Sequence, residues 1–228
     1  MINNIIEIWY WIFMLTALIG VAIYLGFCFV RNLWATLKKR RADGQAMASN
    51  EKAMKQYSKR MVIIHWLTLA LLIMAWYLGD ALDDARSEKG ATLIGYFAHA
   101  LVGGTVLLLT ILRLTFRGMD GTPPPAGDSL MDMVAKGIHY GLYTLLVLLS
   151  VTGFMTVITS SVGAALLAGD ASLLPAKYTG PGLVPHMVHE ILVTVLIVMV
   201  AVHILGAIKH QFIMKDGLMG RMSLRRKG

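Results

Sequence analysis

The feature that most constrains this chain is a series of five long apolar runs, at about residues 8–30, 61–79, 91–112, 138–160 and 184–208. An α-helix needs about 20 apolar residues to cross the hydrocarbon core of a bilayer. The runs are rich in Leu, Val, Ile and Met and are bounded by charges, Gly or Pro, which favours helices over the alternating strands of a barrel. The sequence therefore predicts an all-α integral membrane protein with five spans.

The composition agrees with this class of protein. Hydrophobic residues make up 57% of the 228 residues and charged residues only 15%, whereas about a quarter of a soluble domain is charged. The composition excludes a disordered chain, and the single cysteine, Cys28, excludes a disulfide-rich secreted scaffold. The leader MINNIIE carries an acid in place of basic residues, so we interpret the first run as a retained span and not as a signal peptide.

The basic residues predict the orientation of the spans. Eighteen of the 21 Lys and Arg fall on one side, in segments 31–60 and 113–137 and in the tail from Lys209. The positive-inside rule assigns this side to the cytoplasm, so we expect the N-terminus outside and the C-terminus inside. The net charge of +8 is then a topology signal, and we expect a lipid bilayer as partner and no nucleic acid.

The histidines are the candidate functional residues. All seven lie in or beside the last four spans, where ionisable side chains usually face the interior of the bundle. His189 and His203 are fourteen residues apart, so they share a helix face and lie about 21 Å apart along the axis. His203 is expected at the same depth as His65, near the cytoplasmic boundary, and His189 at the same depth as His99, on the outer side. We therefore pair them in this way.

Each pair of imidazoles suits one metal centre between two helices. The spans offer no carboxylate or thiolate cluster that could complete a small-ion site. Two nitrogens are enough for the axial positions of a haem, since the porphyrin supplies the other ligands. We therefore predict two haems, one on His65 and His203 and one on His99 and His189.

Other residues near these pairs have two interpretations. Gly95 and Gly103 share a face with His99, where they either leave room for a flat macrocycle or allow close helix contact. His186 lies off the face of His189 and His203 and is the poorer ligand. Arg113 and Arg117 either neutralise haem propionates or are simply cations that flank a span.

These residues resemble the bacterial cytochrome b561 family, a group of di-haem, quinone-linked membrane proteins. The resemblance covers about residues 57–222 and is carried by YSKRMVIIHWL, the His99 segment that ends in RLTFR, TPPP, IHYGLY and VHEILVTVLIVMVAVHILGAIKHQFIMKD. It implies a four-helix core with two haem b groups on His65, His203, His99 and His189, in the bacterial cytoplasmic (inner) membrane. It also implies that His139 and His210 border the inner haem or a ubiquinone pocket, the alternative being histidines wetted by headgroups.

With this resemblance the chain divides into four parts. We expect an extra transmembrane helix at 1–30, a cytoplasmic linker at 31–56, a four-helix di-haem domain at 57–222 and a basic tail at 223–228. The outer segment 161–183 is long enough to pack over the mouth of the bundle.

The main functional hypothesis is electron transfer across the membrane between the quinone pool and a donor or acceptor on the periplasmic side. One alternative is a superoxide oxidase that reduces ubiquinone, although the outer segments hold only three basic residues. Another is a membrane anchor for a periplasmic dehydrogenase, hydrogenase or c-type cytochrome, within a homo- or hetero-oligomer. A histidine-lined transporter of metal ions is a further class, which the lack of Asp or Cys in the four histidine-bearing spans disfavours.

Overall fold

The computed structural model describes Arg31 and residues 56–88, 90–123 and 130–225. Gln56–Gly228 forms one compact unit, and every regular element described in it is helical. The expected first span at 8–30 and nearly all of the linker at 31–56 lie outside the described residues, as do the last three residues of the basic tail.

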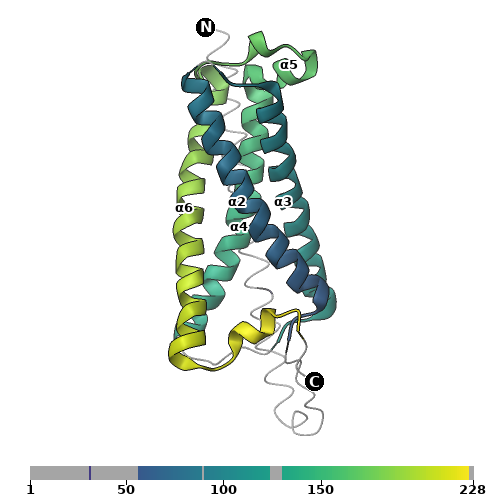
Figure 1. Ribbon diagram of the computed structural model, residues 1–228, viewed down its shortest axis with the longest axis vertical. Helices are drawn as coiled ribbons and strands as arrows, with labels where there is room; N and C mark the ends of the chain where they lie inside the picture. Colours follow the sequence, from purple (N-terminus) through teal and green to yellow (C-terminus); the bar gives the residue numbers. More distant parts are fainter. Residues whose placement is uncertain (1–30, 32–55, 89, 124–129, 226–228) are drawn as a thin grey trace. The chain divides into compact units, whose positions relative to one another are not determined.

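Four of the expected spans are long helices in the structure. They are α2 (Lys59–Ser87), α3 (Leu93–Asp120), α4 (Leu130–Thr159) and α6 (Leu183–Ile208) (Figure 1). Each is long and apolar enough to cross a membrane. The sequence-based prediction of a helical membrane domain is therefore confirmed for this part of the chain.

Three of these helices are longer than their apolar runs. α2 and α3 continue about eight residues, roughly two turns, beyond the ends expected at residues 79 and 112, and α4 begins about eight residues before residue 138. The apolar runs mark only the part of a helix that lies in hydrocarbon. The additional turns carry charged residues, which interrupt the apolar runs without ending the helices, so hydropathy alone places the helix ends too close together.

Local caps set where α2 and α3 begin. The Ser58 hydroxyl accepts a hydrogen bond from the Met61 N–H at the start of α2, and the Thr92 hydroxyl accepts one from the Gly95 N–H at the start of α3. Such side chains satisfy N–H groups that have no partner within the helix. α3 ends at Asp120 and is followed by Gly121, whose φ of 73° is a positive value that glycine adopts without strain.

An apolar layer joins all four helices at mid-depth. Its buried members come from α3, α4 and α6, and α2 adds partly buried leucines against them: Val106, Leu145, Leu146, Leu149, Leu196, Leu71 and Leu72. Leu196 lies seven residues from both His189 and His203. The layer therefore lies between the two depths at which histidines were expected.

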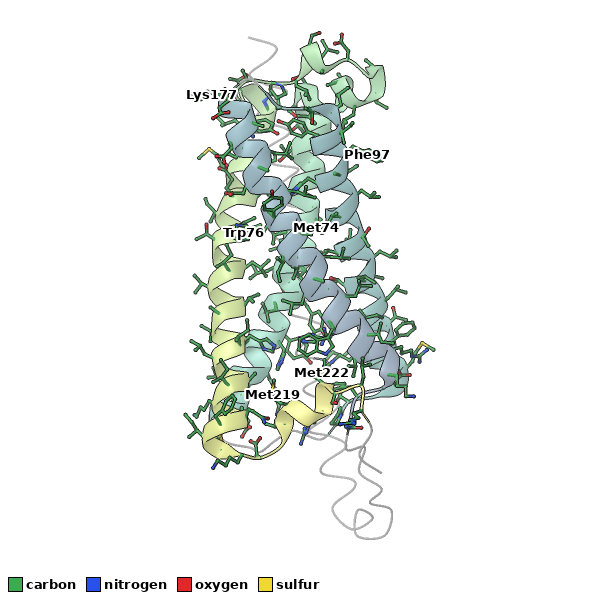
Figure 2. The ribbon with its side chains drawn as sticks, viewed as in Figure 1. Met74, Trp76, Phe97, Lys177, Met219 and Met222 are labelled. Atoms are coloured by element: carbon green, nitrogen blue, oxygen red, sulfur yellow. The ribbon has the colours of Figure 1, made fainter. Side chains whose placement is uncertain are left out.

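The outward faces of these helices are apolar. Trp76 of α2, Phe97 of α3 and Phe154 of α4 are each more than half exposed, and Figure 2 shows Phe97 projecting away from the bundle. Large exposed apolar side chains along every span are what a lipid-facing surface requires. Buried hydroxyls are satisfied inside their own helices, as where Thr110 donates to the Val106 carbonyl.

Segment 161–183 covers one end of the bundle, which we call the outer end after the orientation expected from the sequence. It contains α5 (Ser161–Ala168) and two short 3-10 turns, Ala171–Leu173 and Gly180–Gly182 (Figure 1). Val162 and Tyr178 of this segment are buried against Leu82 of α2 and Tyr96 of α3. The segment therefore packs on the helix ends, as its length suggested.

The C-terminal residues turn back at the opposite end. After a π-helical stretch, Lys209–Met214, the chain reverses at Lys215 and Gly217, which both have positive φ. We call residues 215–225 the return segment, and it includes the short helix Leu218–Met222 (Figure 1). Hydrogen bonds tie this segment to α2 and to the residues just before it: Tyr57 N–H donates to the Arg221 carbonyl, Gln56 Nε2 to the Gly220 and Arg225 carbonyls, and Trp66 Nε1 to the Met222 carbonyl.

Candidate functional site

The outer histidines come from neighbouring helices and face each other. The ring centroids of His99 on α3 and His189 on α6 are 6.2 Å apart, with ring planes at 77°. Both side chains are half-buried within the bundle. The structure therefore brings together the two residues that were paired by depth.

The outer rings are both anchored through Nδ1. His99 Nδ1 lies 3.1 Å from the Ala75 carbonyl of α2, and His189 Nδ1 lies 3.0 Å from the Leu149 carbonyl of α4. A carbonyl oxygen can only accept, so each Nδ1 carries the proton and donates it. Nε2 then keeps its lone pair, which is the form of imidazole that binds a metal.

The inner histidines form a group of three. His65 on α2 and His203 on α6 have ring centroids 6.4 Å apart, and His139 on α4 has its ring centroid 5.1 Å from that of His203. Arg113 on α3 reaches into this group, with its NH1 atom 2.6 Å from His65 Nδ1. The inner pair is thus assembled as predicted, with a third imidazole and a guanidinium beside it.

Both pairs have a spacing that fits a metal between two imidazoles. A first-row metal lies about 2.0 Å from an imidazole nitrogen, so two rings on opposite sides of one ion have centroids about 6 Å apart. The observed values of 6.2 and 6.4 Å meet this requirement. The buried Nε of Arg113 has no hydrogen-bond partner among the described residues, which suits a nearby anionic group such as a propionate. The donor set therefore fits haem at both depths, although the role of these histidines as ligands stays a prediction.

The two glycines that flank His99 differ in their surroundings. A Cβ built on Gly95 would lie 2.9 Å from Leu82 Cδ2, so this glycine allows α2 and α3 to approach closely. A Cβ built on Gly103 would meet no atom within 4 Å. Close helix contact therefore applies to Gly95, whereas Gly103 faces open space.

His139 and His210 lie in different surroundings. His139 contacts the ring of His203, whereas His210 Nδ1 is 2.5 Å from an Asp216 carboxylate oxygen. Burial would raise the pKa of Asp216, but hydrogen bonds from His210 and from the Leu218 N–H outweigh it and hold the pKa below its ordinary value. The carboxylate is therefore charged at neutral pH and orients the His210 ring.

His186 belongs to a polar network on the outer end and not to the histidine pairs. Its Nε2 atom is 3.3 Å from Arg86 NH2 and 3.1 Å from Glu190 Oε1, and its ring packs on Tyr178. Arg86 also pairs with Asp83. Asp83, His186 and Glu190 are close enough to hold a metal ion, but Arg86 already contacts two of the three. We therefore read the cluster as an ion-pair network centred on the guanidinium.

The phenol of Tyr178 is part of the same outer network. Burial raises the pKa of this phenol, and the neighbouring Tyr96 phenol raises it further. Arg86 lies over the Tyr178 ring, 4.8 Å from its centroid. Tyr178 therefore stays neutral at physiological pH and serves this network as a packing surface for the guanidinium and for His186.

Sequence reasoning did not find the groups that orient the imidazoles. The Ala75 and Leu149 carbonyls are backbone atoms of apolar residues, so no side chain in the sequence marks them. Thr152, whose hydroxyl lies 3.1 Å from His189 Nδ1, could have been noticed because it is a polar residue in an apolar run. Arg113 was identified as a candidate for propionate pairing, but its contact with His65 was not expected.

Comparisons with known proteins agree with this arrangement. A family model described as prokaryotic cytochrome b561 matches residues 56–223. A protein named cytochrome b562 from Cereibacter sphaeroides is 28% identical over 170 residues, covering 73% of this chain and 94% of the relative. A probable superoxide oxidase, CybB, from Yersinia pestis is 26% identical over 178 residues, covering 76% of this chain and 99% of the relative. No solved structure matches the chain significantly.

Proposed function

Because this chain belongs to the prokaryotic cytochrome b561 family, we propose that it carries electrons across the membrane through two haem b groups, one held by His65 and His203 and one by His99 and His189. Membership of the family makes the chain a haem b electron-transfer protein and a multi-pass protein of the bacterial inner membrane. Beyond this, we propose the number of haems, the residues that bind them and the reaction partners.

The observation that carries the proposal is the presence of two imidazole pairs at two depths. Each pair has the spacing that a shared metal requires, and an apolar layer around Val106 and Leu196 lies between them. Bound haem would supply reversible one-electron chemistry. The two histidine pairs would hold it at the two depths, the carbonyls of Ala75 and Leu149 would orient the outer rings, and the apolar layer would separate the two sites.

We place the quinone at the cytoplasmic end of the bundle. His139 contacts the ring of His203, and His210 is oriented by Asp216. An imidazole offers a ring nitrogen that can donate a hydrogen bond and one that can accept one, and quinone reduction or quinol oxidation requires such groups to pass protons. Ubiquinone near the inner pair is therefore the expected small-molecule partner.

The outer pair requires a donor or acceptor on the periplasmic side. Segment 161–183, which contains α5 and Tyr178, covers this end of the bundle. Electrons would therefore pass to or from a molecule that binds on this segment or beside it, such as a periplasmic redox protein.

Haem content tests the ligand assignment directly. Purified protein expressed with ample haem supply should contain about two haems per chain, and His189→Ala and His203→Ala should each contain about one. His186→Ala, which alters the outer ion-pair network, is the matched control and should keep two. The pyridine haemochrome spectrum measures these ratios, and two haems in both ligand variants would refute the assignment.

A superoxide oxidase is the second candidate, because one relative is named as a probable enzyme of this kind. Superoxide is an anion and is steered best by a cationic entrance. Here Arg86 at the outer end is paired with Asp83, and Glu190 lies close to His186 in the same network. Stopped-flow decay of superoxide distinguishes the candidates: acceleration with ubiquinone present supports the oxidase, and an unchanged rate rejects it.

A further inference from the structure

Two different helices offer the same pair of contacts to the two outer histidines, and His189 has the Thr152 hydroxyl as an additional neighbour. His99 is contacted by Ala75 and Gly79 of α2, and His189 by Leu149 and Gly153 of α4. In both cases the carbonyl residue precedes the glycine by four positions. Residues four apart lie on the same face of a helix, one turn from each other. Each imidazole therefore meets a carbonyl and a glycine that are stacked along one helix face.

The glycines allow each ring to lie against the helix backbone. A Cβ built on Gly79 would lie 3.1 Å from His99 Cε1, and one built on Gly153 would lie 3.2 Å from His189 Cε1. The corresponding distances to Nδ1 are 3.5 and 3.4 Å. Carbon atoms are in optimal contact at about 3.5–4.0 Å, so a methyl group at either position would force the ring to move. The same ring edge, Cε1 and Nδ1, faces the glycine in both cases.

The carbonyl and the glycine together fix the rotation of the ring. The Nδ1–H bond to the carbonyl selects the tautomer and the direction of Nδ1. The close contact at the glycine prevents the ring from tilting toward that helix. The inner pair is held differently, because His65 Nδ1 faces the guanidinium of Arg113.

We propose that Ala75 with Gly79, and Leu149 with Gly153, form two matched cradles that set the orientation of the outer axial imidazoles, so that Gly79 and Gly153 are positioning residues for the outer haem. This inference rests on the proposed role of His99 and His189 as ligands. The two cradles keep the ring planes near the observed angle of 77°. The relative angle of two axial imidazoles controls the anisotropy of the low-spin ferric EPR signal, so the orientation can be measured apart from any activity.

The test uses Gly79→Ala and Gly153→Ala in the purified full-length chain with haem bound. The added methyl group should displace the ring while the hydrogen bond and the ligand remain, so both variants should keep two haems per chain. The largest g value of the outer haem should shift, and the inner haem signal should stay as in the wild type. Gly118→Ala is the matched control, because a Cβ at that position of α3 meets no atom within 4 Å, and it should shift neither signal.

Larger side chains extend the test to haem binding. Gly79→Val and Gly153→Val should lower the occupancy of the outer haem to less than half while the inner haem stays, and the retained inner haem shows that the bundle has folded. The outer signal is identified as the one that His189→Ala removes. If His189→Ala and His99→Ala remove no signal, the proposed function fails at its ligands. If they remove the outer signal, but Gly79→Ala and Gly153→Ala leave its g values unchanged or shift the inner signal equally, the cradles are refuted.

Discussion

At the scale of single residues, Arg113 distinguishes the inner pair from the outer one. Its NH1 atom lies 2.6 Å from His65 Nδ1, and within the described part of the chain its buried Nε has no hydrogen-bond partner and no carboxylate forms an ion pair with it. A His65 that binds iron through Nε2 keeps its proton on Nδ1 and cannot accept a hydrogen bond there. With haem bound, the guanidinium should therefore turn to an anion, and a propionate is the anion that the cofactor itself brings.

Arg113→Gln should lower the midpoint potential of the inner haem. Removing a nearby positive charge stabilises the ferric form, and a loss of about 1 kcal/mol corresponds to roughly 40 mV for a one-electron couple. Redox titration followed in the visible spectrum measures both potentials, and the outer one should not change. Arg113→Lys keeps the charge and should restore most of the wild-type value. Equal shifts at both haems in Arg113→Gln would contradict the placement of this charge.

The His210–Asp216 pair gives a second prediction at this scale. Asp216→Asn removes the charge that orients the His210 ring, so we expect quinol oxidation to slow about tenfold with haem content unchanged. The lowered pKa of Asp216 gives the sign of the pH effect: the wild-type rate should hold through neutral pH and fall as the pH drops through that pKa. Steady-state rates with a soluble ubiquinol analogue measure both effects. If Asp216→Asn oxidises quinol at the wild-type rate, the His210–Asp216 pair is not part of the quinone site.

At the scale of elements, the return segment is connected to a ligand-bearing helix. Trp66 follows His65 on α2, their rings are in edge contact with centroids 5.3 Å apart, and Trp66 Nε1 donates to the Met222 carbonyl. Figure 2 shows Met219 and Met222 at this end of the bundle. The return segment is therefore hydrogen-bonded to the turn of α2 that carries His65.

Trp66→Phe should loosen the return segment without unfolding the bundle. Phenylalanine keeps the aromatic contact but cannot donate the hydrogen bond to Met222, so local opening becomes easier. Hydrogen exchange of peptides that cover residues 218–222 should accelerate several-fold, whereas peptides from α4 should exchange as in the wild type. Trp76→Phe, at a lipid-facing position of α2, is the control and should leave this exchange unchanged. If residues 218–222 exchange equally slowly in Trp66→Phe and Trp76→Phe, contacts other than the Trp66 hydrogen bond hold the return segment.

At the scale of the whole molecule, the sequence predicts well how deep a side chain lies along its helix, and poorly how the helices are rotated against each other. Rise per residue converts the fourteen positions between His189 and His203 into a distance along the axis, and for that reason the pairing with His99 and His65 could be inferred before the fold was known. The contacts of Ala75 and Gly79 with His99 depend on how α2 and α3 cross and rotate against each other. Packing along both helices sets this crossing geometry, for example where Leu82 lies against Gly95. The residue pattern of a single helix therefore cannot predict it.

The orientation of the domain in the membrane is the remaining prediction at this scale. Four spans between Gln56 and the C-terminus put the α5 segment and the return segment on opposite sides, and the excess of Lys and Arg beside the return segment assigns that side to the cytoplasm. In a Cys28→Ser background, Ser172→Cys should therefore react with a membrane-impermeant maleimide in intact spheroplasts. Leu224→Cys, which is also exposed, should react only after lysis. The reverse pattern would place His139 and His210 on the periplasmic side and would contradict a quinone site at the cytoplasmic end.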